Sequence, residues 1–239
     1  MRSNLFDEAN RETQSPERWA IQHHKMLKVT LGEPVLAAKG SMVAFQGDVE
    51  FQHKSAGSLG KMIRRAVTSE DTPLMTVAGH GEVFFADRAK DVFLVELEGD
   101  GISVNGLNLL AFDANLDYDV HRVKGAGMLS SGMFNTLIRG TGKVALSSDG
   151  QPVILDCSQV PTAVDINAAV CWSASLQPSL RSSMNMRSML RGGTGEAFQY
   201  LFHGPGFVVV QPSEDAPAEA SNGTSGSGGK GLIGDLLGG

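Results

Sequence analysis

The sequence contains only two cysteines, Cys157 and Cys171, in 239 residues. Two thiols are too few for a disulfide scaffold or for a four-thiolate metal site. The chain also lacks any run of about 18 apolar residues that would span a bilayer. Its start, MRSNLFDEANRETQSPERW, carries acidic side chains and no apolar stretch, unlike a signal or transit peptide. We therefore expect a cytoplasmic protein.

Basic charge and aromatic side chains are also scarce. The chain has 20 Lys and Arg against 26 Asp and Glu, which gives a net charge of −6. A dedicated nucleic-acid binder usually presents a basic face, so we expect no nucleic-acid partner. Glycine, in contrast, is abundant at 29 residues, while proline is ordinary at 9. Abundant glycine without a Gly-X-Y period favours many tight turns and many short strands.

What the sequence does contain is a threefold internal repeat. Three 18-residue stretches align: KVTLGEPVLAAKGSMVAF (28–45), VELEGDGISVNGLNLLAF (95–112) and LDCSQVPTAVDINAAVCW (155–172). Each begins with strand-like alternation, breaks at a turn and ends on an aromatic residue, namely Phe45, Phe112 and Trp172. An aliphatic residue follows four positions later, at Val49, Leu116 and Leu176. We predict that the three aromatic residues are buried at equivalent positions.

Each repeat also contains a Gly-x-Gly motif. The three motifs are Gly79 to Gly81, Gly140 to Gly142 and Gly193 to Gly195. We expect each motif to open a β-hairpin, because turn residues such as Asp149-Gly150 and Gly204-Pro205-Gly206 follow. The repeats then span 28–94, 95–154 and 155–212. In each repeat a segment of variable length lies between the aromatic stretch and the Gly-x-Gly motif. These segments are rich in methionine, and residues 58–67 suggest a short helix.

The predicted fold is all-β, with three tandem double-stranded β-helix or jelly-roll-like modules in a pseudo-threefold arrangement. Residues 18–212 form this single domain. Residues 1–17 are expected to be a disordered N-terminal tail. Residues 213–239 are expected to be a disordered Gly/Ser-rich tail, because they have no large apolar residue before the last few positions.

Catalytic chemistry finds little support in the residues. Metal-dependent enzymes built on such modules usually use a His-x-His pair plus a carboxylate, and no such pair occurs. His80 and Glu82 share one face of a strand, but two ligands are fewer than the usual three. Cys171 is expected to be a buried structural thiol. We therefore expect no enzyme activity, no metal and no cofactor. The alternatives are a metal-dependent enzyme of the β-helix class and an RNA-binding module.

Two further groups of residues are candidate binding sites. Lys54, His121 and Arg181 each lie nine residues after the aromatic residue of their repeat, so a threefold arrangement would bring them together as an anion patch. Cations that protect strand edges are the alternative explanation. Near the C-terminus, Leu232, Ile233, Leu236 and Leu237 are spaced as on one side of a short helix. This pattern predicts either a docking peptide or a tail that contacts the protein's own surface.

The motifs resemble a known family. WAIQHHKMLKVTLGEPVLAAKGSMVAF, GMLSSGMFNTLIRGTGKVALSSDGQPVILD and GTGEAFQYLFHGPGFVVVQP are similar to the opening, middle and closing motifs of the mitochondrial biogenesis (altered inheritance of mitochondria) family. The resemblance covers about residues 19–212. It implies three tandem β modules with the fold of the tryptophan RNA-binding attenuator proteins, and no enzymatic activity.

These observations together predict a non-catalytic scaffold or binding protein. Open β modules leave strand edges that a protein covers by pairing with its own copies, so we expect a homo-oligomer, a trimer or a multiple of one. A further partner would be a protein or a membrane surface, to which the chain is peripheral. The C-terminal apolar cluster would dock it to a larger assembly.

Overall fold

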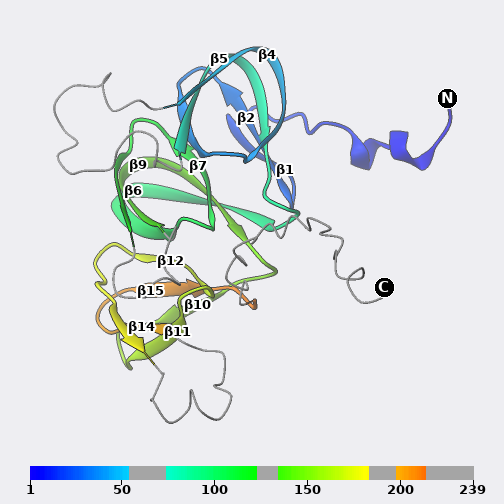
Figure 1. The fold of residues 1–239 in the computed structure, drawn as a ribbon. Coiled ribbons are helices and arrows are strands. Elements are labelled where there is room, and N and C mark those ends of the chain that lie inside the picture. The colour runs from blue at the N-terminus through cyan, green and yellow to red at the C-terminus, as the bar shows by residue number, and fades with distance from the viewer. Residues whose placement is uncertain (54–73, 123–133, 183–197, 214–239) are drawn as a thin grey trace, which may run out of the picture.

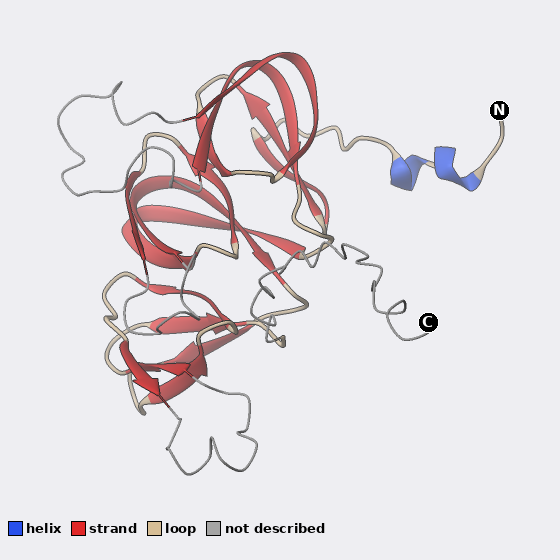
Figure 2. Ribbon diagram, in the orientation of Figure 1, coloured by secondary structure: helices blue, strands red, loops and turns tan. Residues whose placement is uncertain are grey.

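The computed structural model describes residues 1–53, 74–122, 134–182 and 198–213, which are drawn in colour in Figure 1. Strands dominate this part of the chain, and every recorded strand pair is antiparallel. The helical segments of the described residues are two 3-10 turns, η1 (Asn4–Phe6) and η2 (Glu8–Asn10), near the N-terminus (Figure 2). The prediction of an all-β fold is confirmed.

The first unit, called unit 1 below, is built around one long strand. It contains β1 (Trp19–His23), β2 (Met26–Leu31), β3 (Val35–Ala38), β4 (Met42–His53) and β5 (Leu74–Phe85). Along one edge, β5 pairs with β4 over nearly its whole length; along the other it pairs first with β3 and then with β2. The path from β2 to β3 is interrupted near Pro34, which has no N–H to donate to a ladder. β1 covers the outer edge of β2.

Units 2 and 3 repeat this plan. Unit 2 contains β6 (Asp91–Asn105), β7 (Leu109–Asp113), β8 (Asp117–Arg122) and β9 (Phe134–Ser148). Here β9 pairs with β6 on one edge and with β7 and β8 on the other. Unit 3 contains β10 (Val153–Asp156), β11 (Thr162–Asp165), β12 (Ala169–Ser173), β13 (Ser179–Ser182), β14 (Phe198–Phe202) and β15 (Phe207–Val210). β14 lies between β11 and β13, and β15 lies between β10 and β12.

Each unit has a central path that is paired on both edges: β5 in unit 1, β9 in unit 2, and β14 followed by β15 in unit 3. A Gly-x-Gly pair marks the point where this central path changes its partner strand. Gly81 has a φ of +149°, and a Cβ there would lie 2.0 Å from the carbonyl oxygen of Gln46 on β4. Only glycine allows this backbone conformation and this close approach together. Left-handed φ values recur at Gly142 and at Gly206.

Two predictions about these motifs are therefore corrected. The third motif is Gly204 to Gly206, between β14 and β15, while Gly193 to Gly195 lies outside the described residues. The predicted hairpins are also wrong, since β5 does not pair with β6 and β9 does not pair with β10. The reason is that both edges of the central path are already occupied by strands of its own unit.

The three units are stacked in a row in Figure 1, with unit 2 between the other two. Strand pairs join them at equivalent places. β3 of unit 1 pairs with β7 of unit 2, with Leu36 opposite Phe112. β6 of unit 2 pairs with β12 of unit 3, with Ser103 opposite Trp172. Each unit therefore extends the sheet of the unit before it.

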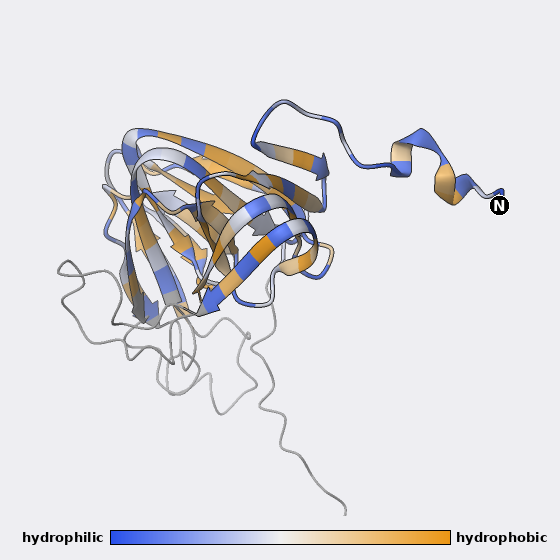
Figure 3. Cartoon of the chain, turned by 90° about the horizontal axis from the view of Figure 1, so that it is seen from above, coloured by the Kyte–Doolittle hydropathy of each residue, from blue (hydrophilic) through white to orange (hydrophobic). Residues whose placement is uncertain are grey.

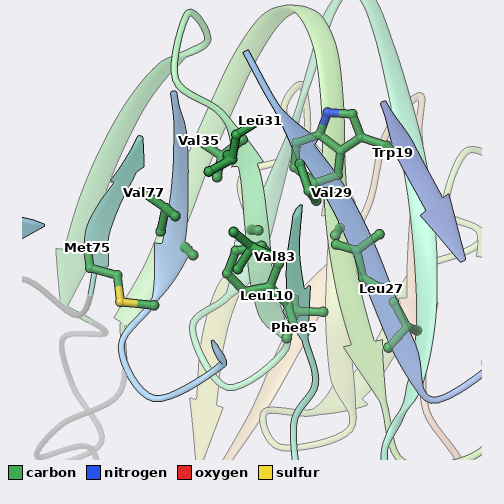
Figure 4. Packing of buried hydrophobic residues seen from close by; sticks show 14 residues of the cluster. Trp19, Leu27, Val29, Leu31, Val35, Met75, Val77, Val83, Phe85 and Leu110 are labelled. Carbon is green, nitrogen blue, oxygen red and sulfur yellow. The ribbon is translucent and has the colours of Figure 1, made fainter. Parts of the chain in front are cut away.

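Each unit has its own hydrophobic cluster. Figure 4 shows side chains of the first cluster, with Val29, Val83 and Leu110 converging from β2, β5 and β7. Leu110 and Ala111 belong to unit 2, so the second unit completes the core of the first. Val170 and Cys171 of unit 3 complete the core of unit 2 in the same way. The cluster of unit 3 contains residues of that unit alone among the described residues.

Candidate functional site

The three aromatic residues that end the aligned repeats occupy equivalent strand positions. Phe45, Phe112 and Trp172 lie opposite the valine two residues after the second glycine of the motif, that is Val83, Val144 and Val208. The ring centroids of Phe45 and Phe51 lie 5.4 Å apart, and those of Phe112 and Tyr118 lie 5.3 Å apart, both pairs in edge-to-face geometry. In each pair the two residues are six positions apart in the sequence. The repeat found in the sequence is therefore present in the packing.

Their burial differs. Phe112 and Trp172 are buried, whereas Phe45 is 47% exposed, so the prediction that all three are buried is wrong for Phe45. The physical reason is position in the stack: units 2 and 3 have a preceding unit that covers this residue, and unit 1 has none. The two residues before Phe45 follow the same rule. Val43 is 52% exposed and Ala44 is exposed, while the equivalent residues of units 2 and 3 are buried.

The opposite end of the stack also exposes apolar side chains. All four residues of β10 are exposed, with Ile154 at 69% and Val153 at 57%. Val160, just before β11, is 61% exposed. Soluble proteins rarely leave an apolar strand open at a sheet edge, because such an edge pairs with other chains. β10 pairs with β15 alone among the described strands.

The sheet has two further open edges. β4 pairs with β5 alone among the described strands, whereas its equivalents β7 and β12 also pair with the preceding unit. β11 pairs with β14 alone in the same set, whereas its equivalents in units 1 and 2 also pair with the following unit. The edges of β4 and β11 are therefore the two halves of a unit-to-unit joint that has no partner within the described chain.

Asp113 is the polar centre of the joint between units 1 and 2. Its carboxylate accepts hydrogen bonds from the Arg18 guanidinium at 2.5 Å, from the Trp19 indole Nε1 at 3.1 Å and from the Lys143 backbone N–H at 2.8 Å. Arg18 also donates to the Glu33 carbonyl at 2.6 Å. The side chains of Arg18 and Trp19 are thus both bonded to this joint.

The joint between units 2 and 3 has an open groove nearby. Ser173 takes the place of Asp113, and its hydroxyl accepts the Phe207 N–H at 3.0 Å. The groove has a volume of about 710 Å³ and is lined by Glu96, Asp100 and Arg139 as well as Ser173. Its lining carries charges of both signs.

Lys28 is a buried lysine that attaches the N-terminal segment. It is 2% exposed, and its ammonium donates to Glu12 at 2.8 Å, to Glu82 at 3.0 Å and to the Thr13 carbonyl at 2.7 Å. Burial alone would lower the pKa of Lys28, but the hydrogen bonds to Glu12 and Glu82 raise it above its ordinary value. The bond to Lys28 lowers the pKa of Glu12. Although Figure 3 shows the first residues extending away from the strands, Glu12 and Thr13 are tied to unit 1.

The residues suggested by sequence for metal and nucleophile chemistry are used otherwise. Glu82 forms its ion pair with Lys28, and His80, two positions away on β5, is exposed. In the described ranges, no group of three or more His, Cys, Asp or Glu is placed to hold a metal ion. Cys171 is buried, as predicted, and burial raises the pKa of its thiol to about 12. Such a thiol stays protonated at neutral pH.

The predicted binding groups are placed only in part. Arg181 lies exposed on β13, opposite Gln199. His121 lies on β8 opposite Asn135, and Lys54 lies outside the described residues. The suggested helix at 58–67 and the C-terminal cluster Leu232, Ile233, Leu236 and Leu237 also lie outside them. The anion patch and the docking tail therefore remain predictions.

Comparison with known proteins identifies the family. Residues 19–213 match the family described as Mitochondrial biogenesis AIM24. The chain belongs to the AIM24 family. This is the family that the sequence motifs resembled, whereas the further likeness to the attenuator proteins remains a prediction.

A structural comparison agrees with the fold. A crystal structure of a Streptococcus pyogenes protein superposes with a TM-score of 0.66 at 20% sequence identity, over 82% of this chain and 92% of that one. At this identity the likeness concerns the fold alone. A comparison with curated proteins gives no match. In the part of the AIM24 chain that the structure describes, no helix has the length and apolar character to cross a membrane.

Proposed function

We propose that this AIM24 chain is a non-catalytic scaffold or binding protein that works as an assembly of its own copies. The observation that carries the proposal is the exposure of apolar side chains at both ends of the stack, on β4 in unit 1 and on β10 in unit 3. Burial of such surface is the main driving force of protein association. A homo-oligomer would bury such surface where its copies meet.

The buried charged groups Asp113 and Lys28 support a structural role, because each of them holds separate segments of the chain together. Asp113 holds the side chains of Arg18 and Trp19, just before and at the start of β1, and one backbone N–H of β9. Lys28 holds Glu12 and Glu82. The alternative of a metal-dependent enzyme rests on His80 and Glu82 as candidate metal ligands. The ion pair of Glu82 with the Lys28 ammonium makes it a poor metal ligand.

The proposal is tested by the mass of the purified full-length protein in light scattering. We expect three copies of the 25.3 kDa chain, or a multiple of three, at micromolar concentration. A monomer at that concentration would contradict the proposal. Elemental analysis of the same sample addresses the enzyme alternative: a stoichiometric transition metal would favour it over the scaffold.

The partner of the assembly is proposed to be a protein or a membrane surface, reached through Leu232, Ile233, Leu236 and Leu237. Deleting residues 231–239 should remove one partner from an affinity pull-down and leave the oligomer intact. A fall of several degrees in melting temperature would instead mean that the segment contacts the protein's own core.

A further inference from the structure

We propose that copies of this chain join head to tail, with the open edge of β11 in one copy pairing with the first half of β4 in the next. This deepens the proposed function, because it names the partner of both open edges as a second copy of the chain. The joint would repeat the two unit-to-unit joints that the chain already contains.

The two existing joints share one register, which the open edge of β11 continues. Leu36 of β3 lies opposite Phe112 of the next unit, and Ser103 of β6 lies opposite Trp172. Within their own units, Leu36 and Ser103 pair with the residue three positions before the first glycine of the motif, Thr76 and Leu137. In unit 3 the residue with this relation is Ala163, which pairs with Leu201, three positions before Gly204.

The register of the new joint follows from this equivalence. Ala163 of one copy would lie opposite Phe45 of the next, as Leu36 lies opposite Phe112. One residue further on, Val164 would lie opposite Ala44, as Ala37 lies opposite Ala111 and Val104 opposite Cys171. Ala163 is exposed, as a residue at an open edge would be.

The burial of apolar residues at the two ends of the chain also fits a head-to-tail joint. In each existing joint, two consecutive residues of the following unit enter the core of the preceding one: Leu110 and Ala111 in the first core, Val170 and Cys171 in the second. The equivalent residues of unit 1 are Val43 and Ala44, which are exposed. The cluster of unit 3 has no residue from a following unit among those described. One end offers the missing residues, and the other end lacks them.

The backbone of β4 has the same local geometry as the strands of the existing joints. The ladder shifts by one residue between Leu109 and Ala111 in unit 2 and between Ala169 and Cys171 in unit 3. The same shift occurs between Met42 and Ala44 in unit 1. The bulge that presents the inserted residues to the preceding unit is thus already formed on β4, although no preceding unit covers it.

Charged side chains beside the proposed joint between β11 and β4 are also complementary. Asn105 donates to the carbonyls of Ile166 and Ala169 across the joint between units 2 and 3. By position in the repeat, Asp165 corresponds to Asn105, and Lys39 corresponds to Ile166. In the new joint, an aspartate would therefore face a turn that begins with the exposed Lys39. Opposite charges at such a place favour the correct register over others.

The test is a pair of engineered cysteines in one full-length chain, Ala44→Cys with Val164→Cys. Directly opposite residues of antiparallel strands lie about 4.5–5.5 Å apart at Cα, within the range that a disulfide spans. We expect oxidation to give a ladder of covalent dimers and higher species on a non-reducing gel. The matched control, Ala44→Cys with Ser175→Cys, keeps the cysteine on β4 and moves the second one from the buried Val164 to an exposed position of unit 3 outside the joint, so it should give no ladder.

A second variant tests the same joint without an engineered disulfide. Phe45→Lys should reduce the oligomer to a monomer in light scattering and leave the melting curve of the chain cooperative, because Phe45 is 47% exposed and lies outside the hydrophobic cluster of unit 1. Leu107→Lys is the control, since Leu107 is 42% exposed and lies away from the joint.

The outcomes separate the two proposals. Oligomeric wild-type protein with no ladder overturns the head-to-tail joint and leaves the scaffold proposal standing. A disulfide formed within single chains overturns the joint as well, because it means that one chain closes on itself. Monomeric wild-type protein overturns both.

Discussion

Phe45 and Phe112 lie at equivalent points of consecutive units, opposite Val83 and Val144, and yet Phe45 is 47% exposed while Phe112 is fully buried. The difference comes from the neighbouring unit and not from the local sequence, because β3 covers β7 and no described strand covers the outer edge of β4. Burial in this fold is therefore a property of the joint between units.

Truncation of these two residues should have different effects. Phe112→Ala should lower the free energy of unfolding by about 3–5 kcal/mol, as for a large core side chain that leaves a cavity. Phe45→Ala should lower it less at high dilution, where the ring contact with Phe51 is lost, and more at protein concentrations at which copies assemble. Urea denaturation at two protein concentrations checks this. Equal losses for both variants at high dilution would contradict the assignment of Phe45 to a joint.

The Asp113 contacts predict a graded loss of stability. Asp113→Ala leaves the Arg18 guanidinium, the Trp19 N–H and the Lys143 N–H without their acceptor, so it should cost about 1.5–3 kcal/mol. Asp113→Ser should cost less, because Ser173 accepts the equivalent N–H in unit 3. Thermal denaturation of both variants measures the difference. An alanine variant as stable as the serine variant would show that the backbone contact carries no weight.

Two glycines that differ in their surroundings give a matched comparison. Gly81→Ala should cost at least about 1–3 kcal/mol from the left-handed backbone alone, and the contact with the Gln46 carbonyl adds to that. Gly32→Ala meets no atom within 4 Å, so it should be neutral or slightly stabilising. Chemical denaturation of the two variants tests the assignment of the motif. A neutral Gly81→Ala would contradict the close approach of β4 and β5.

The attachment of Glu12 to Lys28 should depend on pH. The pKa of Glu12 is lowered from its ordinary 4.5, so its ion pair stabilises the attached state above pH 4.5 and the contribution is lost as the pH falls through the lowered value. The pKa of Lys28 is raised, so the same contact is also lost at high pH, above 10.5.

Limited proteolysis of residues 11–17 as a function of pH measures this attachment. Cleavage should increase below pH 4.5 in the wild type. In Glu12→Gln, which removes the charge but keeps a hydrogen-bond acceptor, cleavage should be faster at neutral pH and change less with acid. A wild-type rate that is constant down to pH 2 would contradict the role of the ion pair.

The repeat was predictable from sequence because its landmarks are local. Aromatic residues, turn glycines and the aliphatic residue four positions later are set by short-range geometry, and Leu116 and Leu176 are buried in the same clusters as Phe112 and Trp172. The third Gly-x-Gly was misplaced because unit 3 contains two such motifs, and only the backbone shows that Gly204 and Gly206 have left-handed φ.

Strand partners and exposed faces were not predictable in this way. The hairpin prediction failed because sequence shows which strands are adjacent in the chain, whereas pairing depends on which edges remain free. The exposure of Phe45 depends on the absence of a preceding unit. The run Val153, Ile154 and Leu155 was readable as an apolar strand, but its exposure at a sheet edge required the topology.

Hydrogen–deuterium exchange of the full-length assembly tests the head-to-tail joint most directly. We expect the outward-facing amides of residues 42–46 in β4 and 162–165 in β11 to be protected together at micromolar concentration, and both segments to lose protection in Phe45→Lys. Fast exchange of either segment in wild-type protein that is oligomeric would contradict it, because both edges would then be open in solution.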